Sequence, residues 1–264
     1  MKLTVLCDNN TFIDQYYLGE PALCFFLENG DDRILFDTGY SDVFMRNAKK
    51  MEIDLDQVNK IVLSHGHNDH TGGLVYYLKE KRNVEVVAHP DTFIYREDET
   101  GVISSPLTAE ELNEKCDLHL TGEPYEFSKD LIYLGKIPVT CEFEKRIPIG
   151  KTGDGEDDYI LDDSALVYKG KDGIFIITGC SHSGICNIIE YAKKVTGTDK
   201  VAGVIGGFHL LQEGERLNRT VEYLKKQKIK DLYPCHCVSL KARIALANET
   251  EIQETGTGLS IEIE

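Results

Sequence analysis

The sequence predicts an α/β fold, a four-layer αββα sandwich in which two mixed β-sheets are flanked by helices. Two observations lead to this prediction. Short apolar segments of strand character occur before residue 90 and again after residue 160, and in both parts they alternate with segments of helical period. Two strand-rich halves with helices on the outside bury their apolar faces when the two sheets pack face to face.

In the first half, short apolar runs bounded by turn residues predict strands. These strands are expected over residues 3–7, 23–27, 33–36, 61–63 and 84–88. The stretch Asn29-Gly30-Asp31-Asp32 is a hairpin signal that joins the second strand to the third. Helical period predicts helices over residues 42–51 and 71–80, the latter with Leu74 and Leu78 on one face.

The middle of the chain is weakly patterned and acidic, which predicts an insertion or lid at about residues 90–160. Within it, the stretch from Gly153 to Asp158 is interpreted as a solvated loop, because it lacks the full spacing of a calcium loop. After the insertion the order resumes. Strands are expected over residues 165–168, 174–177, 201–205 and 231–233, and helices over residues 184–195 and 213–227.

Length and composition favour one compact domain over residues 1–264. The net charge of −16 argues against a nucleic-acid partner, because such binding depends on Lys and Arg that neutralise phosphates. The 8 cysteines are scattered, so we expect them to be reduced. There is no signal-peptide pattern and no apolar run of membrane-spanning length. We therefore expect a soluble cytoplasmic protein with a small-molecule substrate; the oligomeric state stays open.

The strongest chemical signal is His65-Gly66-His67-Asn68-Asp69-His70, directly after the expected strand at 61–63. At a strand end, residues two apart point to the same side, so His65 and His67 can converge on one cation. Asp69 and His70 lie where the chain turns into the next helix and can reach a second cation. Imidazole nitrogen and carboxylate oxygen suit zinc and other borderline divalent metals.

These residues match the His-x-His-x-Asp-His signature of the metallo-β-lactamase superfamily, and Phe36-Asp37-Thr38-Gly39 resembles its earlier Asp-x-Gly motif. The resemblance implies that His65 and His67 hold one metal and that Asp69 and His70 hold the second. It also implies that Asp37 braces the metal loop. The expected cofactors are two divalent ions, zinc first, with manganese or iron as alternatives.

The resemblance points to further ligands at later strand ends. In Thr178-Gly179-Cys180-Ser181-His182, the superfamily's bridging Asp is replaced by Cys180, and His182 is expected to take the place of an intermediate metal His that the region around Asp162 and Asp163 lacks. His236 stands where the last ligand of the family lies. Whether Cys180 is a ligand or a buried small side chain stays open, since buried cysteines are common.

Gly206-Gly207-Phe208-His209-Leu210 follows another strand on the same expected edge. His209 is a candidate for contacting the substrate or donating a proton, with a purely structural role as the alternative. Together with the segments around Cys180 and His236, this stretch resembles the narrower 7,8-dihydropterin-6-yl-methyl-4-(β-D-ribofuranosyl)aminobenzene 5'-phosphate synthase-like branch. The final motif departs from that branch, because Val238-Ser239 replaces its usual Thr-Gly.

The sequence thus favours a binuclear metal-dependent hydrolase of a small anionic ester, phosphoester or related substrate, in which Asp69 orients the nucleophile and His209 stabilises an anionic group. One alternative is a metal-dependent transferase that condenses a dihydropterin with an aryl-riboside phosphate. A second alternative, which the absent bridging Asp keeps open, is a non-catalytic metal-dependent binding protein.

Overall fold

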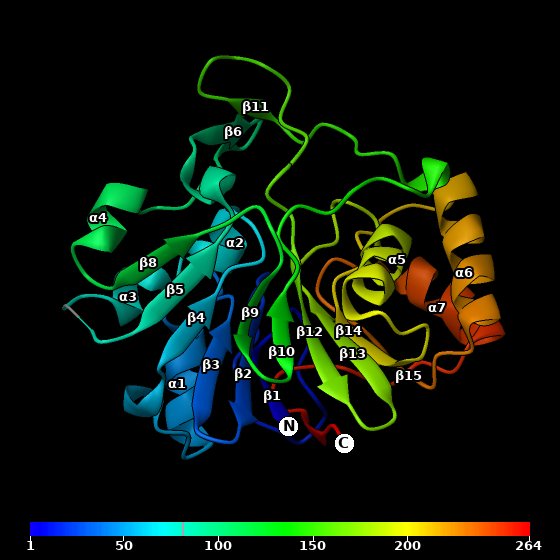
Figure 1. The fold of residues 1–264 in the computed structure, drawn as a ribbon, viewed down its shortest axis with the longest axis horizontal. Coiled ribbons are helices and arrows are strands. Elements are labelled where there is room, and N and C mark those ends of the chain that lie inside the picture. Colours follow the sequence, from blue (N-terminus) through cyan, green and yellow to red (C-terminus); the bar gives the residue numbers. More distant parts are fainter. Residues whose placement is uncertain (81) are drawn as a thin grey trace. The chain divides into compact units, whose positions relative to one another are not determined.

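The computed structural model describes residues 1–80 and 82–264, and the contacts within it define two compact units (Figure 1). Unit 1 comprises Met1–Gly122, Pro148–Asp158 and Gly256–Ile263. Unit 2 comprises Glu123–Ile147, Tyr159–Thr255 and the last residue. Each unit has its own sheet, its own helices and its own apolar core. The expectation of a single domain therefore stays a prediction.

Unit 1 is built on a seven-stranded mixed sheet of order β16-β1-β2-β3-β4-β5-β8. Its strands are β1 (Lys2–Cys7), β2 (Cys24–Asn29), β3 (Asp32–Phe36), β4 (Lys60–Val62), β5 (Glu85–Ala88), β8 (Asp117–Leu120) and β16 (Ser260–Glu262). The strands β3, β4, β5 and β8 run parallel to one another, whereas the pairs β16–β1, β1–β2 and β2–β3 are antiparallel. The carboxyl ends of β3, β4 and β5 therefore lie on one edge of the sheet.

The helices of unit 1 are short: α1 (Val43–Lys50), η1 (Leu55–Gln57), α2 (Asn68–Thr71), α3 (Leu74–Tyr77), η2 (Pro90–Phe93) and α4 (Ala109–Asn113). The prediction of one helix over residues 71–80 is wrong, because α2 and α3 are separate. The Gly73 N–H donates to Gly39 O at 3.0 Å, and the Thr38 N–H donates to His70 O at 2.7 Å. These bonds hold the junction of the two helices against the segment that follows β3.

The segment expected to be a lid contains regular structure that the weak periodicity did not predict. In unit 1, β6 (Arg96–Asp98), β7 (Gly101–Val102) and β11 (Lys151–Thr152) form a three-stranded sheet. In unit 2, β9 (Tyr125–Ser128) and β10 (Leu131–Tyr133) join the main sheet beside β12. The prediction of a lid over residues 90–160 is not tested by these elements.

Unit 2 is built on a six-stranded mixed sheet of order β15-β14-β13-β12-β10-β9. The strands expected over residues 165–168 and 174–177 are present as the hairpin of β12 (Ala165–Gly170) and β13 (Gly173–Thr178). The strands β14 (Val201–Gly206) and β15 (Asp231–Pro234) run parallel to β13. Since β13, β14 and β15 are parallel neighbours, their carboxyl ends share one edge of this sheet.

The helices of unit 2 are η3 (Glu142–Glu144), α5 (Ile185–Thr196), α6 (Glu215–Gln227) and α7 (Leu240–Glu249). The helix α5 packs against β12 and β13, and α6 lies beside α5 and α7 (Figure 1). The buried carboxylate of Glu144 accepts from the N–H groups of Cys186 at 2.8 Å and Asn187 at 3.1 Å, which caps the first turn of α5.

The predicted α/β fold with two mixed sheets flanked by helices is confirmed. Over the part of the chain that the structure describes, no helix combines the length and the apolar character that crossing a membrane requires.

Candidate metal centre

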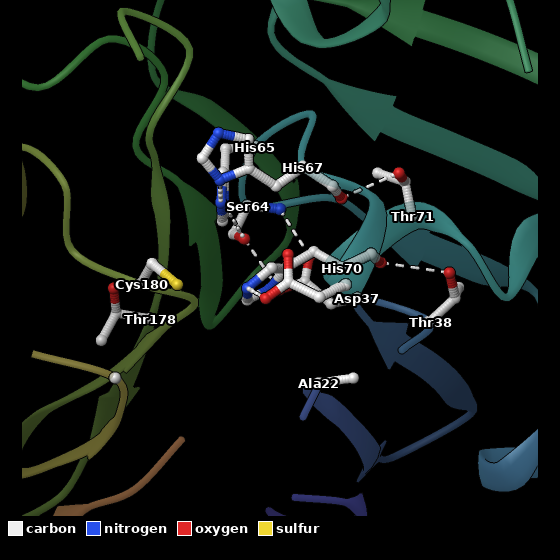
Figure 2. A network of polar contacts seen from close by, with 12 residues as sticks. Ala22, Asp37, Thr38, Ser64, His65, His67, His70, Thr71, Thr178 and Cys180 are labelled. Carbon is white, nitrogen blue, oxygen red and sulfur yellow. Dashed lines mark hydrogen bonds and ion pairs between the residues drawn. The ribbon is translucent and has the colours of Figure 1, made fainter. Parts of the chain in front are cut away.

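The histidine motif spans the turn after β4 and most of α2 in unit 1, at the carboxyl edge of the sheet (Figure 2). Leu63 extends the buried path of β4, and the chain then turns so that two imidazoles face each other. His65 Nε2 lies 3.1 Å from His67 Nδ1. Two nitrogens bound to one tetrahedral zinc ion are roughly 3.3 Å apart. The geometry of this donor pair is therefore compatible with one metal ion.

Asp37 braces this motif from the end of β3 (Figure 2). Its Oδ1 accepts from the Ser64 N–H at 2.7 Å, and its Oδ2 accepts from Ser64 Oγ at 2.7 Å. The same Oδ2 lies 2.7 Å from His70 Nδ1. This bond leaves Nε2 as the nitrogen of His70 that can bind a metal. The bracing role that the resemblance implied for Asp37 is confirmed by these contacts.

Asp69 and His70 form the second donor pair of unit 1. Asp69 Oδ2 lies 3.6 Å from His70 Nε2, and the Asp69 side chain is partly exposed whereas His70 is fully buried. The carboxylate and the imidazole are oxygen and nitrogen donors of the kind that zinc and iron accept. Unit 1 thus offers two adjacent donor pairs, which agrees with the two metals expected.

A buried arginine lies behind the motif, and sequence reasoning missed it. Arg96 is fully buried, and its Nε donates to Asp158 Oδ2 at 2.7 Å. A Cβ at Gly66 would lie 2.2 Å from the Arg96 guanidinium and 1.9 Å from Thr92 O. Gly66 is therefore needed so that the loop between the two histidines can approach this support.

Asp158 corrects one expectation about the acidic stretch. Residues 153–157 are exposed, as a solvated loop should be, but Asp158 is only 4% exposed and is paired with Arg96. Neither residue carried a local signal, because their contact spans 62 positions of the chain.

The β6–β7 hairpin contacts the same motif through the two residues that follow β7. His67 forms a β-bridge with Ser104, and the Asn68 N–H donates to Ile103 O at 2.8 Å. The hairpin thereby fixes the backbone between the two donor pairs of unit 1, and it is a further support that the weak periodicity of this segment concealed.

In unit 2, the remaining predicted site residues lie at the carboxyl ends of three parallel strands. Cys180 and His182 follow β13, His209 follows β14, and His236 follows β15. The Cys180 sulfur lies within 4.8 Å of a His236 ring nitrogen. The His182 and His209 rings lie 4.4 Å apart between centroids. The fold of unit 2 therefore gathers these side chains on one edge.

All three strand ends in unit 2 place a non-glycine residue in the left-handed region. The φ angles are 58° at Ser181, 48° at His209 and 51° at His236. Such conformations cost on the order of 1–3 kcal/mol each and concentrate at functional sites. The Ser181 hydroxyl donates to Gly207 O at 2.6 Å, which holds the first two strand ends together.

Asp163, just before β12, braces the strand end that carries His182. Its Oδ2 accepts from the Ser183 N–H at 2.8 Å. Burial raises the pKa of the Asp163 carboxyl, while the charge of Arg146 and the N–H groups of Ser183 and His182 act in the opposite direction. Asp163 thus contacts the loop that carries His182.

His89 is not grouped with the metal donors by the structure. Its Nδ1 accepts from the Asp91 N–H at 3.1 Å and caps η2, which is a structural role.

A family model described as the metallo-β-lactamase superfamily matches residues 18–195, more than half of the chain. The motif geometry and this match agree, and the chain belongs to the metallo-β-lactamase superfamily.

Three proteins are similar to this chain over most of its length. Uncharacterised protein MJ0448 of Methanocaldococcus jannaschii is 35% identical over 249 residues, which is 93% of each chain. The 7,8-dihydropterin-6-methyl-4-(beta-D-ribofuranosyl)-aminobenzene-5'-phosphate synthase of the same organism is 32% identical over 266 residues, covering 92% of this chain and 89% of the synthase. The crystal structure of Tm1679, described as a metal-dependent hydrolase of the β-lactamase superfamily, matches with a TM-score of 0.84 at 28% identity and covers 99% of this chain and 98% of the other.

Proposed function

We propose that this chain is a binuclear metal-dependent hydrolase of a small anionic ester, phosphoester or related substrate. The donors of unit 1, His65, His67, Asp69 and His70, would hold the two ions, and the sequence assigns His182 and His236 of unit 2 as further metal ligands. The observation that carries the proposal is the facing pair His65 Nε2 and His67 Nδ1 at 3.1 Å beside a His70 oriented by Asp37. Metal-binding histidines almost always donate their other ring N–H to a partner such as this carboxylate.

When bound, divalent ions lower the pKa of water and polarise the scissile group of a substrate. The side chains supply the rest. Asp69, partly exposed beside His70, would orient the nucleophile. His209, whose ring lies 4.4 Å from that of His182, would donate to an anionic group of the substrate. The backbone of His209 is left-handed, a strained conformation that concentrates at functional sites.

The relatives support two different reactions. Tm1679, 28% identical, is described as a metal-dependent hydrolase, which supports hydrolysis. The synthase from Methanocaldococcus jannaschii, 32% identical, supports the second candidate, a transferase that condenses a dihydropterin with an aryl-riboside phosphate. A binding protein that performs no turnover is the third reading, and Cys180 in place of the superfamily's bridging Asp favours it.

The first prediction is that the purified chain carries about two divalent ions and turns over a small anionic substrate. Metal content would be measured without chelator in wild type, His65→Ala and His67→Ala. Activity would be measured on bis-p-nitrophenyl phosphate, a thioester, a β-lactam and a pterin with an aryl-riboside phosphate, after addition of zinc, manganese or iron(II). His67→Ala is the blank. We expect metal-dependent ester cleavage and no efficient opening of the β-lactam.

Three results would change this proposal. Metal-dependent condensation of the pterin pair with no ester cleavage would replace the hydrolase by the transferase. Metal binding with no turnover on any substrate would favour the binding protein. Equal, near-zero metal in wild type and both variants after reconstitution would remove the metal centre itself.

A further inference from the structure

We propose that Tyr95 contacts the substrate, with its ring stacked on an uncharged planar aromatic group, while the anionic group of the same molecule binds at the metal donors. The inference rests on the proposed function, because it names the substrate class of that site. Tyr95 immediately precedes β6 in unit 1, and it is 47% exposed. Binding sites for small molecules combine aromatic side chains with a few polar groups or metals that fix the orientation of the ligand.

The strand pairing places Tyr95 and His67 on the same face of the small sheet. Tyr95 and Glu97 are two residues apart, and the Tyr95 hydroxyl donates to Glu97 Oε2 at 2.7 Å, so their side chains share one face. Glu97 lies opposite Val102 of β7. Ser104, two residues after Val102, forms the bridge with His67. Since opposite residues project to the same side, Tyr95, Val102 and His67 share this face.

The other face of the small sheet is buried, and its contacts support this alternation. Arg96, the neighbour of Tyr95, is fully buried. A Cβ at Gly66, the neighbour of His67, would lie 2.2 Å from the Arg96 guanidinium. Arg96 and Gly66 therefore meet on the buried face, and their neighbours Tyr95 and His67 project from the opposite one.

The ring is the part of Tyr95 that a ligand can contact. The Tyr95 hydroxyl is engaged by Glu97, which leaves the apolar ring as the exposed surface. A Cβ at Gly153 would lie 3.4 Å from the Tyr95 Cβ, so a glycine at this position leaves the adjacent side of the ring uncovered. Val102, 55% exposed, adds an apolar side chain to the same face. Together these residues form an apolar surface beside the histidine motif.

The position and the charge of the β6–β7 hairpin define the class of ligand. Neighbouring strands are about 4.8 Å apart, so Tyr95 stands two spacings, about 10 Å, from His67. A phosphoryl group joined to one aromatic ring spans this interval when the metal donors hold the anion. The hairpin carries Glu97, Asp98 and Glu99, which disfavour a second anionic group there. The ligand that fits is therefore an aryl ester or aryl phosphoester whose ring carries no negative charge.

The experiment measures the binding of three phosphonates to the metal-loaded full chain by isothermal titration calorimetry. Phenylphosphonate carries an aromatic ring, cyclohexylphosphonate carries an apolar ring of similar size that is not planar, and methylphosphonate supplies the anionic group with no ring. The variants are Tyr95→Phe, Tyr95→Leu and, as the matched control, Tyr16→Leu, which removes an exposed tyrosine of unit 1 between β1 and β2. Metal content and the thermal unfolding midpoint are recorded for each protein.

We expect wild type to bind phenylphosphonate about 3- to 10-fold more tightly than cyclohexylphosphonate, which is the contribution of an aromatic pair beyond the burial of apolar area. Tyr95→Phe and Tyr16→Leu should keep this preference. Tyr95→Leu should lose the preference and still bind methylphosphonate as wild type does.

Three results would overturn the role of Tyr95 and leave the metal centre to its own test: equal affinities for the two ring compounds in wild type, an unchanged preference in Tyr95→Leu, or no binding of any phosphonate. A chain that shows the preference that depends on Tyr95 but cleaves no ester would uphold this inference and overturn the hydrolase.

Discussion

At the scale of single residues, the orientation of the metal donors depends on carboxylates that need not touch a metal. Asp37 accepts two hydrogen bonds from Ser64 and holds His70 Nδ1, all at 2.7 Å and all buried. Outer-shell partners of this kind fix the tautomer of a metal-binding histidine, and their loss costs about 10–100-fold in metal affinity.

We therefore predict that Asp37→Asn weakens metal binding by about 10–100-fold, because the amide cannot accept from all three partners at once. Competition with a chromophoric chelator measures the change. Asp32→Asn is the matched control. Asp32 is the first residue of β3, at the end of the strand away from Asp37, and its carboxylate pairs with Lys60. Equal affinities in Asp37→Asn and wild type would contradict the bracing role.

The sequence predicted the candidate metal-binding residues better than the buried residues that hold them in place. The spacing of His65, His67, Asp69 and His70 is local, so the pattern contains the information. Arg96 and Asp163 act through contacts with residues 62 and 20 positions away, and nothing in the local pattern marks such partners. A buried charge in a weakly patterned segment becomes informative only when its partner is known.

At the scale of secondary-structure elements, the end of β13 is the part of unit 2 whose position matters most. It carries Cys180 and His182, and Asp163 fixes it from the residue before β12 through the Ser183 N–H. Since β12 and β13 form a hairpin, one carboxylate can align the ligand loop with the sheet.

We predict that His182→Ala lowers metal occupancy more than Asp163→Asn does. The first change removes a proposed ligand, whereas the second removes a support and keeps the ligand. Metal content after dialysis, read beside the thermal unfolding midpoint, separates loss of ligand from loss of fold. An Asp163→Asn variant that loses more metal than a silent His182→Ala would reverse the two roles.

Elements with strong periodicity were predicted well, and those that depend on tertiary contacts were not. The hairpin of β12 and β13 and the helices α5 and α6 match their expected ranges closely. The strands β8 and β9 were missed because their residues are half buried or exposed and lack a clean alternation, and the buried β10 was missed because it is only 3 residues long. The break between α2 and α3 depends on the bond from Gly73 to Gly39, which no helical pattern can reveal.

At the scale of the whole molecule, the net charge of −16 bears on which ligands can approach. Polynucleotide binding gains most of its affinity from cations that replace condensed counterions, and a chain this acidic repels the phosphate backbone.

We predict no binding of labelled RNA or DNA at physiological salt, measured by fluorescence anisotropy up to a protein concentration of about 10 μM. Chelator-treated protein is the control, because it removes any contact that a bound metal would make with phosphate. Salt-dependent binding in the micromolar range would contradict the small-molecule substrate and move attention to nucleic acids.

The buried ion pair of Arg96 and Asp158 also affects what would happen to unit 1 if a protease cut the chain nearby. The exposed turn at residues 153–157 has β11 on one side, paired with β6, and Asp158 on the other, paired with Arg96. Exposed loop tips are preferred sites of protease nicking. A cut within this turn would leave both new ends anchored to the same small sheet. The peptide chain could therefore be severed within this turn while the support of the histidine motif stays assembled.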